Sequence, residues 1–393
     1  MNIGFDAKRA YHNGTGLGQY SRTLISSLAE FYPEHDYYLF NPKKGTKFNL
    51  QQQNVHQVLP TFPLSLFSSL WRSGLVKSDL KKNNIDVYHG LSHEIPVGIQ
   101  NTPIKSVVTI HDLIHERYPE QYNPIDVNIY RKKFRYACEN ADKIIAISHQ
   151  TKSDIIKYYK IPAEKITVCY QSCNPIFSHQ IEEQEKVLIK KKYQLPDEYF
   201  LYVGSIIERK NLLTVCKALL QLSHLKIPLV VIGDGEKYKQ QVKEFINENN
   251  LQDQVIFLSE KNISKEDGFI SGKDFPAIYQ SAMAMIYPSI FEGFGIPVLE
   301  ALFSKLPVIT SNVSSLPEAG GDAAYYIDPT NAGEIAEAMQ KLYKDEELRN
   351  GLIKKGIQQA ENFTTKKCAA AVMDVYLTLN PSTSENNFIK VFN

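Results

Sequence analysis

Two glutamates flank a glycine-rich turn in the segment Ser289–Ala301. The segment follows an expected buried strand at Ala284–Tyr287, and Pro297, a residue favoured in the first turn of a helix, marks an expected helix start. A helix start presents unpaired N–H groups and partial positive charge, which suit an anion such as phosphate. The carboxylates Glu292 and Glu300 can accept hydrogen bonds from paired sugar hydroxyls. The other interpretation of the same residues is a structural turn in which Glu300 only stabilises the helix.

A second segment, Tyr202–Leu212, combines an expected strand, a glycine turn and a helix start that carries Arg209 and Lys210. Cations at a helix start are disfavoured by the helix dipole, so their presence indicates a binding role more than a surface role. Arg and Lys suit a site where a departing group gains negative charge. A surface basic pair is the alternative.

The N-terminal part contains Asn13–Tyr20, in which Gly14, Gly16 and Gly18 precede an expected helix. Three glycines ahead of a helix resemble a dinucleotide-binding fingerprint, although this spacing alone has low specificity. A flexible turn explains the same pattern.

His111 and Asp112 follow the expected strand Ser106–Ile110. In open α/β sheets, ligands bind beyond the carboxyl ends of the strands. We therefore treat His111 as a candidate site residue, and Asp112 as a residue that either orients it or holds the turn. A lone buried histidine with a structural role is the alternative.

These candidates require a fold that brings strand ends together. Short runs that are apolar on both faces alternate with amphipathic stretches of helical length, which is typical of βαβ units with parallel sheets. We expect strands at Ser106–Ile110, Lys143–Ile147, Phe200–Val203, Leu229–Ile232, Val255–Leu258, Ala284–Tyr287 and Pro307–Thr310. We expect helices at Thr23–Phe31, Thr151–Tyr159, Leu212–Leu222, Asp274–Ser281 and Ala332–Tyr343.

The alternating pattern starts twice, with a polar, charged stretch at residues 177–197 between the two sets. We expect an α/β protein of two doubly wound, Rossmann-like domains that face a cleft. The expected domains are residues 1–180 and 181–370, and the tail 371–393 is expected to pack back on the N-terminal domain.

Composition narrows the class of protein. The chain has 393 residues, with 44 Lys and Arg against 43 Asp and Glu, a formal net charge of +1. This balance argues against a nucleic-acid partner and against an acidic disordered chain. The 5 cysteines are scattered, so we expect reduced thiols and no metal set. With no expected signal sequence or membrane span, we expect a cytoplasmic protein.

The segment at residues 291–301 resembles, without a gap, the E-x7-E signature of the retaining glycosyltransferase family 4, which has the GT-B fold. The resemblance covers roughly residues 1–375. It implies that Glu292 contacts donor-sugar hydroxyls and that Glu300 takes the ribose hydroxyls. It further implies that the intervening backbone holds sugar and phosphate, through Phe294, Gly295, Ile296, Val298 and Leu299.

The other motifs fit the same family. Residues 202–212 resemble its diphosphate segment, which implies that Lys210 and Arg209 neutralise the nucleotide diphosphate. Many members carry Arg directly after the glycine, where this chain has Ser205, so Arg209 would supply that charge. The resemblance places His111 against the donor sugar near the phosphate. It also places the loop of Gly16 and Gly18 near the diphosphate and the acceptor.

The implied reaction is a retaining, metal-independent transfer of a hexosyl group from a sugar nucleotide to a hydroxyl of a glycan or lipid-linked acceptor, with no cofactor. Metal independence follows from the two cations and the helix start, and from the lack of an Asp-x-Asp sequence. GDP-mannose is the first choice of donor, because Arg209–Asn211 resembles mannosyltransferase-like members. Phe62–Val76 and the basic, aromatic run Arg131–Tyr136 could contact the acceptor or the inner face of a membrane, or could instead be amphipathic helices packed inward.

Three alternatives stay open from the sequence. The donor could be a UDP-hexose or a UDP-N-acetylhexosamine. The chain could instead be a sugar-nucleotide epimerase or a phosphorylase, although no segment suggests the lysine that a pyridoxal-type phosphorylase needs. It could also be a non-catalytic module that binds a nucleotide sugar.

Overall fold

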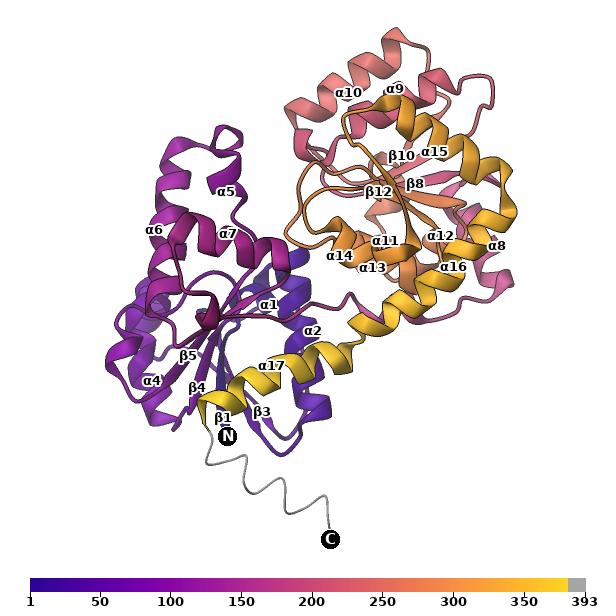
Figure 1. The fold of residues 1–393 in the computed structure, drawn as a ribbon. Helices are drawn as coiled ribbons and strands as arrows, with labels where there is room; N and C mark the ends of the chain where they lie inside the picture. Colours follow the sequence, from indigo (N-terminus) through magenta and orange to yellow (C-terminus); the bar gives the residue numbers. More distant parts are fainter. Residues whose placement is uncertain (381–393) are drawn as a thin grey trace. The chain divides into compact units, whose positions relative to one another are not determined.

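A computed structural model of the chain describes residues 1–380 and divides it into two compact units. The first holds Met1–Ser172 and the segment that begins at Phe363, and the second holds Cys173–Asn362. Each unit contains one wholly parallel sheet covered by helices, so the expected doubly wound α/β fold is confirmed (Figure 1).

The first unit contains a seven-stranded sheet in the order β3-β2-β1-β4-β5-β6-β7. Its strands are β1 (Asn2–Asp6), β2 (Asp36–Phe40), β3 (Val55–Val58), β4 (Val87–Gly90), β5 (Lys105–Ile110), β6 (Lys143–Ala146) and β7 (Ile166–Val168). Its helices are α1 (Lys8–His12), α2 (Gly16–Phe31), α3 (Ser68–Leu70), α4 (Val76–Lys82), α5 (Ile114–Arg117), α6 (Pro124–Asn140), α7 (His149–Tyr159) and α17 (Thr365–Leu379). A π-helical turn, Trp71–Leu75, joins α3 to α4.

The second unit contains a six-stranded sheet in the order β10-β9-β8-β11-β12-β13. Its strands are β8 (Phe200–Val203), β9 (Leu229–Ile232), β10 (Val255–Phe257), β11 (Ala284–Tyr287), β12 (Val308–Ser311) and β13 (Ala324–Ile327). Its helices are α8 (Glu183–Tyr193), α9 (Leu212–Gln221), α10 (Lys237–Glu248), α11 (Asp267–Ile270), α12 (Phe275–Gln280), α13 (Ile296–Phe303), α14 (Leu316–Gly320), α15 (Ala332–Lys344) and α16 (Glu346–Ala360).

The two strand orders share one topology. In the first sheet the order reverses between β1 and β4, and in the second between β8 and β11. Ligands of doubly wound folds bind beyond the carboxyl ends of the strands at this reversal. The fold therefore marks one such position in each unit.

The division into units differs from the expected boundaries. Residues 173–180 lie with the second unit, where the Phe177 ring packs 4.9 Å from that of Tyr279. Residues 363–370 lie with the first unit, because α17 buries Ala369, Val372 and Met373 in its core. The expected tail 371–393 lies partly in α17, and its residues 381–393 fall outside the described part of the chain.

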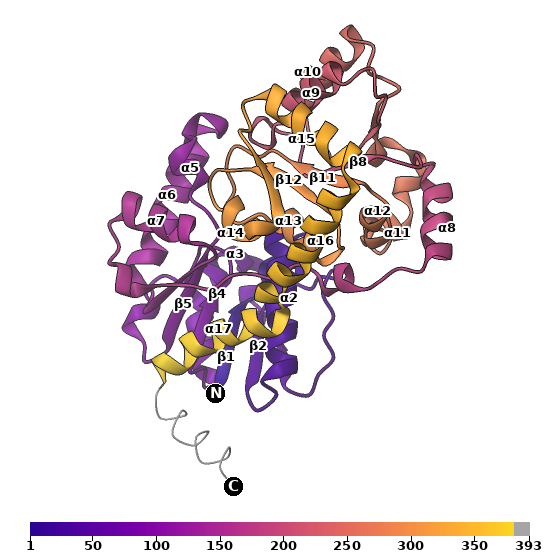
Figure 2. The ribbon, with the colours of Figure 1, turned by 45° about the vertical axis from the view of Figure 1, so that its right-hand side comes forward.

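Helix α17 is fixed to the first unit by packing and by one buried polar contact. It lies along α2 and beside β1 (Figure 1 and Figure 2). The Tyr376 hydroxyl and His89 Nδ1 are 2.5 Å apart, and His89 Nε2 lies 2.7 Å from Thr109 Oγ1. Both rings are fully buried. A buried polar group without a hydrogen-bond partner is energetically unfavourable. The contact therefore favours one position of α17 on the first unit.

We expect Tyr376→Phe to lower the free energy of unfolding of the first unit by about 1–3 kcal/mol, because a buried imidazole nitrogen loses its partner. Urea unfolding followed by circular dichroism measures this. Tyr38→Phe is the matched control in the same unit, since within residues 1–380 the Tyr38 hydroxyl has no hydrogen-bond partner. Equal stability of the Tyr376 variant and the wild type would contradict the assignment.

Candidate functional site

The carboxyl ends of β8 and β11 bring the two predicted segments of the second unit together. The two strands pair in parallel, and the turn after each begins at the same edge of the sheet. Gly204 has φ +150°, and a Cβ there would lie 3.0 Å from Cδ of Lys210. The glycine therefore makes room for the Lys210 side chain to lie across the strand end.

Glu292 lies where these two turns meet, and its partners converge on Oε1. Arg209 Nη1 lies 2.9 Å and Lys210 Nζ 3.5 Å from this atom. The hydroxyls of Tyr287 and Ser289 donate hydrogen bonds to it at 3.0 and 2.7 Å. These four contacts all involve Oε1, and Oε2 can accept a hydrogen bond from a ligand hydroxyl.

This arrangement keeps Glu292 ionised. Burial raises the pKa of Glu292, but Lys210 and Arg209 and the hydrogen bonds from Ser289 and Tyr287 together outweigh it, and the pKa falls to about 2. Lys210 Nζ also donates to the Tyr287 hydroxyl at 2.7 Å and lies over the Tyr287 ring. Tyr287 thus links the lysine to the glutamate, and the three side chains hold one another in place.

The backbone of the glutamate turn is fixed by two serines from the turn after β12. Ser315 Oγ donates to the carbonyls of Glu292 and Phe294, each at 2.9 Å. Ser314 Oγ accepts from the Glu292 N–H at 3.1 Å. Gly295 has φ +119°, a conformation that favours glycine, and α13 begins directly after it at Ile296. The predicted strand–turn–helix arrangement is therefore present.

Glu300 lies in α13 and has a different environment. Its Oε2 accepts a hydrogen bond from the Tyr279 hydroxyl at 2.8 Å. Burial raises the pKa of Glu300 to about 7, and the Tyr279 hydrogen bond and Lys210 only partly oppose the rise. The two glutamates of the motif therefore differ, with one ionised throughout the neutral range and the other titrating within it.

The remaining predicted residues of the second unit differ in what they can offer a ligand. Ser205 is exposed directly after Gly204. The side chains of Phe294, Val298 and Leu299 are buried, so these residues can reach a ligand only through their backbone. Ile296, the first residue of α13, is partly exposed.

In the first unit, Gly16 and Gly18 lie at the start of α2. A Cβ on Gly18 would lie 2.0 Å from the Asn13 carbonyl oxygen, so a close backbone approach requires this glycine. Gly16 is exposed and a Cβ there would have open space. Asn13 Oδ1 accepts from the N–H groups of Thr15 and Gly18, at 2.7 and 3.3 Å, and this holds the turn.

His111 lies buried at the carboxyl end of β5. Its Nε2 lies 2.9 Å from the Leu91 carbonyl oxygen, which can only accept, so Nε2 carries the proton and Nδ1 is the acceptor of the neutral ring. Burial lowers the pKa of His111 to about 4. Asp112 Oδ1 accepts from the Ile114 N–H at 3.1 Å, as expected of a residue that holds the turn.

Sequence reasoning missed the hydroxyl groups that support Glu292. Tyr287 ends an apolar strand, where it looks like an ordinary core residue, and Ser314 and Ser315 lie more than twenty residues further on. A strand-end tyrosine directly before a glutamate turn is the signal that could have identified Tyr287.

Residues 1–380 lack two other kinds of feature. No three His, Cys, Asp or Glu side chains there are arranged to hold a metal ion. No helix in the same range is long and apolar enough to cross a membrane.

Both units match glycosyltransferase family models. Residues 14–175 match the model described as Glycosyltransferase Family 4, and residues 183–359 match that of Glycosyl transferases group 1. With the two parallel α/β units, these matches define a glycosyltransferase of the GT-B class. The chain belongs to glycosyltransferase family 4, as its motifs predict.

Its relatives include enzymes named as mannosyltransferases. The chain is 26% identical to O-antigen chain mannosyltransferase B of Escherichia coli over 96% of this chain and 100% of that protein. It is 27% identical to the Escherichia coli serotype-specific mannosyltransferase WbdA over 76% of this chain, but this match spans only 36% of WbdA. A solved structure, Anabaena Alr3699/HepE in complex with UDP and glucose, has a TM-score of 0.71 at 15% identity and covers 95% of this chain and 98% of its own.

We expect Tyr287→Phe to reduce glycosyl transfer by about ten- to a hundredfold, since losing hydrogen bonds to a charged pair costs about 1.5–3 kcal/mol. The ring stays in place, so the fold should be kept. Initial rates at saturating donor, together with the thermal midpoint, measure both effects. An unchanged rate at an unchanged midpoint would show that the link between Lys210 and Glu292 is not needed.

Proposed function

We propose that this glycosyltransferase transfers a mannosyl group from GDP-mannose to a hydroxyl of a glycan or glycolipid acceptor, with retention of configuration and without a metal ion. The observation that carries the proposal is the preassembled cluster of Glu292, Arg209 and Lys210. The names of the relatives support the choice of mannose. The setting we propose is the assembly of a surface polysaccharide.

The diphosphate of the donor is the part that this cluster suits best. Arg209 and Lys210 carry two positive charges against the one negative charge of Glu292. Both cationic groups lie within 3.5 Å of Glu292 Oε1. The start of α13 adds backbone donors and the positive end of a helix dipole. These groups would stabilise the negative charge that grows on the leaving diphosphate, which is the role a metal ion has in other transferases.

The sugar would lie against the ionised carboxylate. Glu292 Oε2 can accept from a sugar hydroxyl, and a carboxylate held ionised can stabilise positive charge on the ring as the bond to phosphate breaks. In the first unit, His111 can offer a ligand its Nδ1 as an acceptor, because its Nε2–H is already used by Leu91. In the reaction we propose, the acceptor hydroxyl attacks on the face from which the phosphate leaves, and the leaving phosphate takes the hydroxyl proton.

The runner-up donor is a UDP-hexose or a UDP-N-acetylhexosamine. It is favoured by the structural neighbour whose complex contains UDP and glucose. The cluster would act in the same way on either diphosphate, so the base and the sugar must be separated by experiment.

A thermal-shift panel of GDP-mannose, GDP, UDP-glucose, UDP-N-acetylglucosamine and UDP tests the donor. Ligand at about one hundred times its dissociation constant stabilises a protein by about 2.7 kcal/mol, which shifts the thermal midpoint by several degrees. We expect a shift with the guanosine ligands and release of GDP only when an acceptor is present. A shift with the uridine ligands alone would replace the donor, and no shift with any ligand would overturn the assignment.

Glu300 should make donor binding depend on pH. Ribose hydroxyls donate to an ionised carboxylate, so binding lowers the pKa of Glu300 from its value of about 7 and releases a proton. We therefore expect the donor affinity to be constant above this pKa and to fall below it, by at most about tenfold per pH unit. Titration calorimetry between about pH 6 and 8 measures this.

Glu300→Gln is the matched variant for this prediction, since the amide keeps an acceptor oxygen but does not titrate. It should bind more weakly than the wild type above pH 7, and its affinity should change less with pH. Identical pH profiles in the two proteins would assign the dependence to another group and remove Glu300 from the site.

A further inference from the structure

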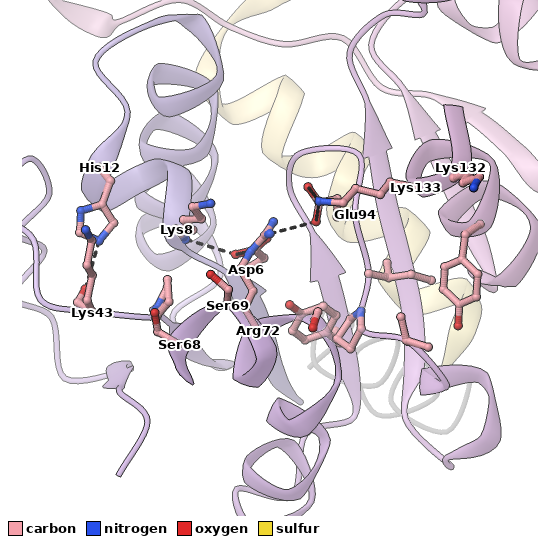
Figure 3. Close-up of a pocket in the computed structure, with 17 residues that line it drawn as sticks. Asp6, Lys8, His12, Lys43, Ser68, Ser69, Arg72, Glu94, Lys132 and Lys133 are labelled. Carbon is pink, nitrogen blue, oxygen red and sulfur yellow. Dashed lines mark hydrogen bonds and ion pairs between the residues drawn. The ribbon is translucent and has the colours of Figure 1, made fainter. Parts of the chain in front are cut away.

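The first unit contains a cavity of about 550 Å³ beyond the carboxyl ends of β1, β2 and β4, at the reversal of its strand order (Figure 3). All of its lining residues belong to this unit. Two segments that the sequence singled out separately meet in its wall. Ser68, Ser69 and Arg72 come from the first segment, and Lys132 and Lys133 from the second.

Positive charge dominates the lining. The charged residues are five cations, Lys8, Lys43, Arg72, Lys132 and Lys133, and two anions, Asp6 and Glu94. Figure 3 shows these residues around the cavity. Five positive against two negative charges leave an excess of three.

Both anions are already paired. Arg72 binds the Asp6 carboxylate through Nε and Nη2, and its Nη1 donates to Glu94 at 2.9 Å. Lys133 lies 3.4 Å from the same Glu94. Arg72 therefore joins Asp6 and Glu94 across the cavity wall, and its positive charge is neutralised by these two carboxylates.

Three of the lysines have no such partner. Within residues 1–380, no carboxylate lies within ion-pair distance of Lys8, Lys43 or Lys132. Burial lowers the pKa of Lys8, and Arg72 and Arg9 lower it further, against the smaller opposing effects of Asp6 and Glu94. Lys8 is thus a cation among cations, and an anion beside it would relieve the repulsion.

Apolar side chains flank the lysines on both segments. Phe62, Leu66 and Phe67 are exposed by 81%, 70% and 60% beside Ser68 and Ser69. In α6, Ile125 and Ile129 are exposed at the helical spacing that places them on the face of Lys132. Cations at the cavity with apolar groups next to it suit an anionic group attached to an apolar chain.

We propose that this cavity binds a phosphate or diphosphate group carried by the acceptor, through Lys8, Lys43, Lys132 and Lys133. The proposal rests on the proposed transfer, since it names the chemistry of the acceptor. Lysines bind phosphate as point charges, and the paired Arg72 keeps the wall in one arrangement. The group can belong to a lipid or to a free phosphorylated glycan, and the shared chemistry is the phosphate ester.

The test is calorimetric titration with inorganic pyrophosphate. Pyrophosphate would also bind at Arg209 and Lys210, so every protein in this test carries Lys210→Ala to weaken that site. On this background we expect Lys8→Ala with Lys132→Ala to weaken pyrophosphate binding by about tenfold or more. Lys81→Ala with Lys82→Ala, two exposed lysines of α4 outside the cavity, removes the same charge and should leave the affinity unchanged.

Equal affinity in the two double variants would overturn the proposal, since the effect would then come from net charge alone. The donor panel, run on the Lys8 and Lys132 double variant with Lys210 intact, separates this failure from that of the proposed function. Nucleotide binding should be unchanged there. If the wild type bound no nucleotide, the proposed transfer would be rejected, whether or not pyrophosphate binds.

A second arm identifies the source of the phosphate. Co-sedimentation uses vesicles of phosphatidylcholine with and without phosphatidic acid, and the variant Phe62→Ser with Phe67→Ser. Sedimentation that needs phosphatidic acid and both phenylalanines supports a lipid phosphate. Pyrophosphate binding without sedimentation supports a free phosphorylated acceptor. Equal sedimentation with both vesicles, without pyrophosphate binding, would reject the phosphate site and leave only a membrane contact.

Discussion

The buried ion cluster at Glu292 is the interaction on which the rest of the site depends. A buried carboxylate is unfavourable unless cations and hydrogen-bond donors surround it. Here Arg209, Lys210, Tyr287 and Ser289 all serve the same oxygen. The second oxygen is therefore held in one position, and a ligand can bind it with little reorganisation.

The parallel sheet makes this cluster possible. Glu292 and Lys210 are eighty-two residues apart in sequence, and they meet only because β8 and β11 are neighbours that end at one edge. The serines that hold the glutamate turn arrive in the same way, from the end of β12. Strand order thus determines which loops supply groups. The first unit repeats that order, and its cavity lies at the corresponding reversal between β1 and β4.

The sequence predicts the fold class and the motif residues, because buried parallel strands form apolar runs and because helix starts carry glycine or proline. It does not predict the supporting groups. Tyr287 and Ser314 are part of no sequence motif. Ser314 has a backbone φ of +56°, a left-handed conformation that the sequence does not predict for a serine. The domain boundary near residue 363 was missed for a similar reason. Long-range contacts, such as the packing of α17 along α2 and the contact between Tyr376 and His89, show which unit holds α17.

Charge links the two proposed anion sites. The chain as a whole carries a net charge of only +1, so long-range attraction contributes little, and screening removes most of it beyond about 8–10 Å. Selection of an anion must then come from cations gathered at short range. At the proposed donor site two cations share one carboxylate, whereas in the cavity Arg72 pairs with both carboxylates and leaves Lys8, Lys43 and Lys132 uncompensated. Because each arrangement needs residues from several loops, neither could arise from a basic run in the sequence, and near-neutral composition is compatible with both.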